Sequence, residues 1–512
     1  MVYFISAWYD GNNWREREQV WYIAKHITEF DDTIKQVQLF SRNKLYPYKI
    51  ILLSHAPNFR HFLHRQSIFR ADYWSVFDQM QCITSRTQRP FSYHDIQWPD
   101  DVEFISSHFA IIVRRKGEKF AQVEFGDDGN MILVKLFEND QISRINHYDD
   151  RGFVSMTEMY KDGKPYYEQY MNEDRVWKFN RYVEDGHVDI NPLNNFFLWP
   201  EGEKEFKKLR YDNIEEMIEE VLVRYVNRTN DDDIFCVAMH SLHTDLWAKL
   251  LRRRKTILSF YETRFSLVKN EVMERFLRDA GYIVTATRED GDKIREVMGQ
   301  SYPRMTSITP YDSRVDEGIS MEFPYQNILV MSDGVPKDRF DEICDELVKY
   351  VIQHHKTKVN FYTTSLDYQR INELKNRARD LNTKVNSSSD VKGEYFVLAR
   401  CLEAMETNRK LREARLLVDL QDIPNQFLQI SAISMGVPQI TFRETQYMKN
   451  GRNGHALESV QELNEWVAYY LKDLSNWNHA RVQSYEMGAE FTTSEIQRQW
   501  TEVIRHVENN WS

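Results

Sequence analysis

The chain has 512 residues, of which 42% are hydrophobic and 28% are charged, and its formal net charge is −11. This length exceeds what one hydrophobic core usually supports, so we expect three or four folded units. The acidic balance argues against nucleic acid as a partner, because duplex binding needs a basic face. The longest apolar runs, such as Tyr395–Ala399, are too short to span a membrane.

The first hundred residues predict strands that alternate with helices. The strands are expected at Val2–Trp8 and Tyr48–Ser54, and helical patterns cover Thr33–Phe40, Phe59–Phe69 and Trp74–Ile83. This alternation is typical of a parallel sheet with helices on its faces. We therefore assign residues 1–102 to the first part of a Rossmann-like domain.

A different pattern begins near residue 103. Turn signals recur at regular spacing, for example Asp127-Asp128-Gly129-Asn130 and Lys161-Asp162-Gly163-Lys164, and short β-prone runs such as Ile132–Leu136 lie between them. Turns at this spacing favour an antiparallel meander. The sequence thus predicts an inserted antiparallel β-sheet domain at residues 103–192.

Helix and strand alternation then resumes and completes the first Rossmann-like domain at residues 193–320. A second Rossmann-like domain is expected at 321–490, followed by a C-terminal helix at 491–512 that returns to the first domain. The expected strands of the two series are Ile234–Ala238, Thr256–Tyr261, Tyr282–Ala286 and Met305–Ile308, then Ile328–Met331, Lys358–Thr363, Tyr395–Ala399, Arg415–Asp419 and Gln439–Phe442. The predicted fold class is α/β, with two Rossmann-like domains, an inserted antiparallel β-sheet domain and a C-terminal helical crossover.

Metal and cofactor chemistry is not indicated. The two histidine pairs with metal-like spacing, His61/His64 and His240/His243, lack the glutamate of a zinc protease, so we expect no metal and no cofactor. The four cysteines are far apart and have neither metal nor redox spacing, so we expect buried thiols in a reducing cytoplasm: Cys82, Cys236, Cys344 and Cys401. The opening residues lack a basic leader and a cleavage site, so we expect no export signal.

The segment Asp422–Phe442, DIPNQFLQISAISMGVPQITF, predicts a loop, a helix that ends at Gly436 and a strand after Pro438. In open parallel sheets, ligands lie beyond the carboxyl ends of the strands, where helix N-termini receive phosphates. Retaining glycosyltransferases with two Rossmann-like domains place two glutamates here, eight positions apart, ahead of a Gly-x-Pro. Aligned on this Gly-x-Pro, the pattern puts Ile423 and Ser431 at the two glutamate positions.

The basic side chains that would hold a diphosphate are also few. Ser332 stands where an arginine is expected, and only Lys337 and Arg339 are near. Losing one charged contact typically costs about 3 kcal/mol of transition-state stabilisation, so we expect little activity. Two alternatives stay open: an active transferase with a rewired donor site that uses Glu444 or Asp422, and a structural partner with an empty cleft.

Other side chains are candidates for binding a ligand in the expected cleft. Trp8 and Asn12 belong to a loop rich in aromatic and amide groups after the first strand, which suits carbohydrate, although core packing is the better explanation of Trp8. The other candidates are Lys337, Arg443 and Asn453 in the second domain.

Several stretches spread over the whole chain match a known family, among them Tyr3–Tyr9, Asp149–Ser155, Ile433–Ile440 and Leu474–Asn478. The chain resembles the first accessory secretory proteins of the accessory Sec system in Gram-positive bacteria. The resemblance implies a GT-B type fold without transferase activity, in a cytoplasmic protein that meets the membrane peripherally through the translocase. It also implies an adaptor that binds glycosylated serine-rich repeat adhesin together with two sister accessory secretory proteins and the motor ATPase. The alternative is an active retaining glycosyltransferase that uses a nucleotide sugar to modify a serine-rich protein.

Overall fold

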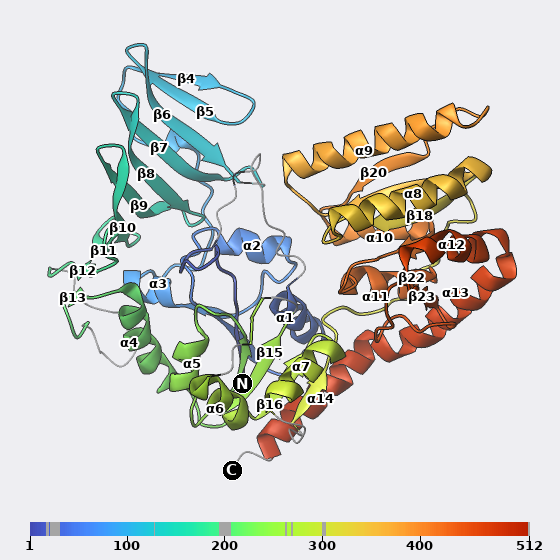
Figure 1. Cartoon of the computed structure of the whole chain (residues 1–512). Helices are drawn as coiled ribbons and strands as arrows, with labels where there is room; N and C mark the ends of the chain where they lie inside the picture. Colours follow the sequence, from blue (N-terminus) through green and yellow to red (C-terminus); the bar gives the residue numbers. More distant parts are fainter. Residues whose placement is uncertain are drawn as a thin grey trace.

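The computed structural model describes residues 1–16, 20, 31–126, 128–193, 206–261, 264–267, 270–298 and 304–509. It contains three sheets, two parallel and one antiparallel, and helices cover the parallel ones (Figure 1). This confirms the predicted fold class. Residues 194–205, at which we expected the first Rossmann-like domain to resume, lie outside the described residues.

The first domain is built on a seven-stranded parallel sheet in the order β17-β16-β15-β14-β1-β2-β3. Its strands are β1 (Val2–Ile5), β2 (Tyr48–Leu52), β3 (Tyr73–Ser75), β14 (Ile234–Ala238), β15 (Lys255–Phe260), β16 (Tyr282–Thr285) and β17 (Met305–Ser307). Its helices are α1 (Asp32–Asn43), α2 (Phe59–Arg65), α3 (Val76–Gln81), α4 (Ile214–Val226), α5 (Thr244–Leu250), α6 (Glu271–Asp279) and α7 (Arg288–Met298). The helix that we predicted from Trp74 was wrong at its start, because Trp74 pairs with Ile51 in the edge strand β3.

The inserted sheet has ten antiparallel strands in sequence order. They are β4 (Val102–Ser106), β5 (Ile111–Arg115), β6 (Glu118–Phe125), β7 (Met131–Glu138), β8 (Gln141–Asp149), β9 (Phe153–Lys161), β10 (Lys164–Met171), β11 (Trp177–Tyr182), β12 (Val188–Ile190) and β13 (Arg210–Tyr211). The sheet therefore extends past residue 192, where we placed its end, because β13 pairs with β12 through Val188 and Tyr211.

A buried ion cluster fixes this sheet to the first domain. In the turn between β8 and β9, Arg151 contacts Asp149 at 2.7 Å and Asp78 of α3 at 2.8 Å. Arg60 of α2 pairs with Asp150 and lies 3.3 Å from Asp149. Because each buried charge has an opposite partner, the cluster holds the sheet in one orientation on α2 and α3.

The second domain has a six-stranded parallel sheet in the order β20-β19-β18-β21-β22-β23. Its strands are β18 (Gln326–Met331), β19 (Thr357–Thr363), β20 (Phe396–Arg400), β21 (Ala414–Val418), β22 (Gln439–Thr441) and β23 (Gly454–Ala456), the last of which the sequence did not predict. Its helices are α8 (Lys337–Gln353), α9 (Tyr368–Ser387), α10 (Ala404–Glu413), α11 (Gln426–Met435) and α12 (Leu463–Lys472).

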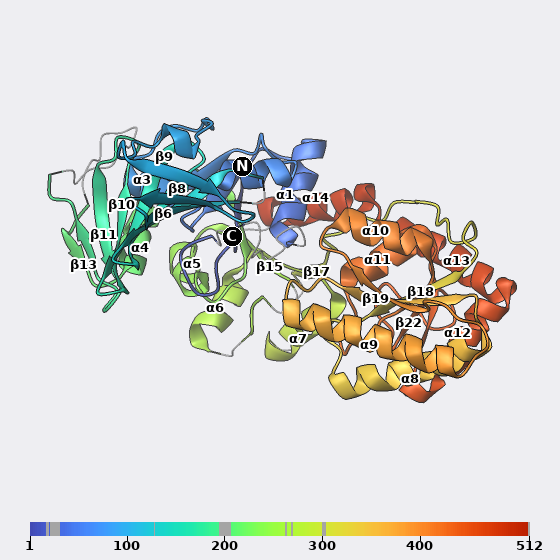
Figure 2. The ribbon, with the colours of Figure 1, turned by 90° about the horizontal axis from the view of Figure 1, so that it is seen from above.

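Two long helices carry the chain back to the first domain. α13 (Leu474–Gly488) packs on α11, and α14 (Thr493–Asn509) lies beside α1 (Figure 2). α14 is amphipathic, and Trp500 on its buried face meets Phe40 of α1 edge to face, with ring centroids 5.9 Å apart. Within the described residues, no helix is long and apolar enough to cross a membrane.

Candidate functional site

A cavity of about 260 Å³ opens between the two Rossmann-like domains. The first domain contributes four side chains that follow β16, and the second contributes the loop after β21, the start of α11 and the segment after β22. The site thus lies beyond the carboxyl ends of parallel strands, as expected for this architecture. The lining residues from the first domain are Thr287, Glu289, Asp290 and Lys293.

The floor beneath this cavity is apolar and joins the two domains. Tyr261 and Ala286 of the first domain pack with Ile430, Ile433 and Tyr447 of the second. Above them, the side-chain amide of Gln426 donates a hydrogen bond of 2.9 Å to the Ala286 carbonyl. α11 is therefore held directly against the first domain.

The two positions of the missing glutamates have different environments. Ile423 lines the cavity with 52% of its surface exposed. Ser431 lies on α11 with 6% exposed and is not among the residues that line the cavity. The two positions therefore do not form one site, since α11 turns Ser431 into the packed interior.

The second-domain wall of the cavity carries no carboxylate among the described lining residues. Arg443 is the one cation among the described residues of this wall. Most of its polar side chains are amides, namely Gln421, Asn425, Gln426 and Gln429. The carboxylates come from the first domain, where Asp290 already accepts hydrogen bonds from Thr287 at 2.8 Å and Lys293 at 3.2 Å.

The loop that forms this wall is organised by a buried carboxylate at the end of β21. Asp419 accepts the backbone N–H of Asn425 at 2.6 Å and of Gln421 at 3.3 Å. Burial raises the pKa of Asp419 to about 6. Asn425 in turn caps α11 by accepting the N–H of Leu428 at 2.9 Å. The loop and the start of α11 are therefore held in place by Asp419 and Asn425.

The basic side chains expected for a diphosphate are engaged elsewhere or displaced. Ser332 is fully buried, and its hydroxyl donates to the Tyr362 carbonyl at 2.7 Å. Arg339 forms an ion pair of 2.8 Å with Asp422, so its positive charge is paired with the loop after β21. Lys337 is exposed at the first position of α8 and does not line the cavity.

Two buried amide atoms at the cavity have no hydrogen-bond partner among the described residues. They are Oε1 of Gln426, an acceptor, and Nε2 of Gln429, a donor, on side chains that are 5% and 1% exposed. Buried polar atoms are usually paired, so these two are exceptions, and both side chains belong to the wall of the cavity. Neither glutamine was a site candidate in the sequence analysis, although both are polar residues, like Ser431 and Ser434, in an otherwise apolar helix.

The remaining candidates from the sequence lie away from this cavity. Trp8 is buried and donates to Asp31 at 3.0 Å, and Asn12 is exposed in the turn after β1. Asn453 is fully buried and holds its own loop through the Lys449 N–H at 2.8 Å and the Tyr447 carbonyl at 2.9 Å. Of the five candidate ligand-binding residues, Arg443 is the one that lines the cavity.

Two facing Rossmann-like domains, an inserted antiparallel sheet and a returning C-terminal helix define a glycosyltransferase-like protein of the GT-B type. The crystal structure of the pneumococcal O-GlcNAc transferase GtfA with UDP and GlcNAc matches this fold with a TM-score of 0.72, at 11% identity over 99% of each chain. This likeness concerns the fold alone.

The family model of the first accessory secretory protein of the accessory Sec system matches residues 1–507, and the chain belongs to this family. It is 30% identical to the family's member from Streptococcus gordonii, over 99% of each chain. A chain in the crystal structure of accessory secretory proteins 1, 2 and 3 of Streptococcus pneumoniae superposes with a TM-score of 0.82, at 28% identity over 100% of both chains. The resemblance seen in the sequence is confirmed.

Proposed function

We propose that this protein is a non-catalytic, glycosyltransferase-like adaptor of the accessory Sec export system. It acts in the cytoplasm, binds glycosylated serine-rich repeat adhesin together with two sister accessory secretory proteins, and delivers the adhesin to the motor ATPase of the translocase. The observation that carries the proposal is the second-domain wall of the cleft, where amides line the cavity and no described lining residue is a carboxylate.

The composition of this wall separates binding from catalysis. Transfer of a sugar develops positive charge on the ring and negative charge on the leaving diphosphate, which carboxylates and cations stabilise. Ile423 offers no polar atom, and Ser431 and Ser332 are buried. Amides can still bind sugar hydroxyls in the ground state, because each amide both donates and accepts. Ground-state binding without transition-state stabilisation is what an adaptor requires.

The partners are supported by the solved relatives. The pneumococcal structure contains accessory secretory proteins 1, 2 and 3, and a structure from Streptococcus agalactiae, 26% identical with a TM-score of 0.80, is named the Gap123 complex. We propose that this chain occupies the equivalent place in a complex with its own two sister proteins.

The first experiment is a calorimetric titration of the purified chain with UDP, UDP-N-acetylglucosamine and a glycosylated serine-rich repeat peptide. We expect the glycopeptide to bind more tightly than the unglycosylated peptide, and we expect no release of UDP from the nucleotide sugar in the presence of the acceptor peptide. Gln429→Ala should weaken glycopeptide binding, whereas Gln369→Ala, at an exposed site on α9, should not.

Catalytic turnover of the nucleotide sugar would overturn the proposal in favour of an active retaining glycosyltransferase. Equal affinity for the glycosylated and the unglycosylated peptide would overturn glycan recognition. A pull-down in which the purified chain fails to capture its two sister proteins would contradict only the proposed complex and not the binding in the cleft.

A further inference from the structure

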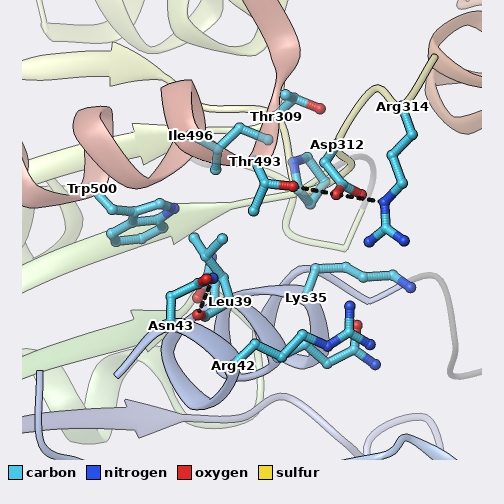
Figure 3. A pocket seen from close by; sticks show the side chains of 13 residues that line it. Lys35, Leu39, Arg42, Asn43, Thr309, Asp312, Arg314, Thr493, Ile496 and Trp500 are labelled. Carbon is cyan, nitrogen blue, oxygen red and sulfur yellow. Dashed lines mark hydrogen bonds and ion pairs between the residues drawn. The ribbon is translucent and has the colours of Figure 1, made fainter. Parts of the chain in front are cut away.

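A second cavity lies at the hinge between the domains, away from the cleft. Its volume is about 120 Å³, and its walls come from three separate elements: α1, the linker residues 309–314 and the beginning of α14 (Figure 3). Leu39, Ile496 and Trp500 form its apolar side. We call it the hinge cavity.

The charged residues of the hinge cavity are mostly basic. Lys35 and Arg42 come from α1 and Arg314 from the linker, and their charged ends point to the same side of the cavity in Figure 3. The single carboxylate among the described lining residues, Asp312, already accepts hydrogen bonds from Thr493 at 2.6 Å and Arg314 at 3.0 Å. In a chain with a net charge of −11, this is a local concentration of positive charge.

The guanidinium of Arg42 is available to bind an anion. Within the described residues its guanidinium makes no hydrogen bond and no ion pair. Its place in the last turn of α1 suits the helix dipole, which favours cations at that end. The dipole of α1 does not explain why Arg314, from the linker, lines the same cavity.

The volume and the donors define the ligand. Because one water takes about 30 Å³ of liquid volume, the cavity holds the equivalent of about four waters. Pockets for drug-sized ligands are larger, at about 300–1,000 Å³, so a nucleotide is excluded. A tetrahedral oxyanion fits, since guanidinium forks match its oxygens and bind them with charge-assisted hydrogen bonds. We propose that the hinge cavity binds a small soluble phosphate, as inorganic phosphate or pyrophosphate.

A bound phosphate would connect the two domains. The backbone N–H of Arg314 donates to the Ser434 hydroxyl of α11 at 3.1 Å, so this part of the linker is attached to the second domain. Lys35 and Arg42 belong to α1 of the first domain. A phosphate held by Arg314 and Arg42 together would therefore bridge the linker and α1.

The experiment measures the thermal stability and the heat of binding of the full chain with inorganic phosphate and pyrophosphate, at constant ionic strength kept with sodium chloride. We expect the melting temperature to rise with phosphate concentration, because a ligand that binds only the folded state stabilises it. Arg42→Gln and Arg314→Gln should each raise the Kd at least about tenfold. Arg42→Lys, which keeps the charge but loses the fork, should give a smaller loss.

The matched control is Arg443→Gln, since Arg443 is the exposed cation of the cleft. It should leave phosphate affinity unchanged. If Arg443→Gln abolishes binding and Arg42→Gln does not, the anion belongs to the cleft and the proposal is wrong. The proposal is also wrong if phosphate raises the melting temperature no more than sodium chloride does and if Arg42→Gln leaves this rise unchanged. So does Arg42-dependent binding to phosphatidylglycerol vesicles without binding to free phosphate, which would make the ligand a lipid headgroup.

Discussion

The side-chain amide of Gln426 donates a hydrogen bond to the backbone carbonyl of Ala286, and this 2.9 Å bond crosses from the second Rossmann-like domain to the first. Among the described residues, the same glutamine leaves its carbonyl oxygen unpaired beside the cleft cavity. One residue therefore fixes the contact between the domains and also belongs to the wall of the cleft cavity. The cleft is held at its floor by α11 and the apolar cluster beneath it.

Gln426→Ala should loosen this contact. A typical buried hydrogen bond contributes about 1 kcal/mol, and the Ala286 carbonyl would keep the longer 3.4 Å bond from Gln446. We expect a lower midpoint of thermal unfolding, followed by circular dichroism. The control Gln369→Ala, on the exposed surface of α9, should change the midpoint little, and an equal shift in both variants would contradict the role of the interdomain bond.

A glutamate introduced at Ile423 should affect the stability of the protein differently from a glutamate introduced at Ser431. Ile423→Glu places a carboxylate on a side chain that is 52% exposed, so we expect little change in stability. Ser431→Glu places one at a position that is 6% exposed, and an unpaired buried charge costs about 3 kcal/mol or more. Urea unfolding of the two variants distinguishes them. Equal tolerance of both would mean that Ser431 faces the cleft after all.

Breaking the ion cluster should release the inserted sheet. Asp150→Asn removes the negative charge that pairs with the buried Arg60 guanidinium. Breaking a buried ion pair typically costs about 3–5 kcal/mol. We expect faster proteolysis within the sheet, detected by mass spectrometry of the fragments. Asp174→Asn, in an exposed turn of the same sheet, removes a charge without this effect. Unchanged cleavage in Asp150→Asn would show that the sheet is held by other contacts.

Acid should destabilise the first domain through His243. Burial lowers the pKa of His243 to about 3, and the neutral ring bonds the Tyr9 hydroxyl and the Ala238 carbonyl, both at 2.7 Å. Because the folded-state pKa lies below the ordinary value of 6.5, the unfolded state binds more protons between these two values. The contribution of neutral His243 to the free energy of unfolding is therefore fully present above about pH 6.5. It decreases from there towards pH 3, by up to about 1.4 kcal/mol per pH unit.

The variant His243→Gln should show a smaller dependence of the melting temperature on pH between about 6.5 and about 4 than the wild type. His94→Gln, at an exposed position, should keep the wild-type dependence. Identical pH profiles for His243→Gln and the wild type would exclude His243 as the source of the effect.

The sequence by itself determined the local elements and their order. Strand and helix periodicity predicted both parallel sheets, the turns predicted the antiparallel insertion, and the Gly436–Pro438 pattern predicted the loop, helix and strand that follow β21. These features depend on neighbours in the chain, which a sequence displays directly. The edge strands β3 and β23 were missed because they are short and owe their existence to pairing with β2 and β22.

Only the tertiary structure decided which side chains share a site. It turned Ser431 and Asn453 inward, brought Gln426 to Ala286 across 140 positions, and placed Arg42 and Arg314 in the wall of one hinge cavity. The physical reason is that burial and hydrogen-bond partners depend on contacts between residues remote in sequence. A residue type limits what a side chain can do, and the packing of the domains determines what it meets.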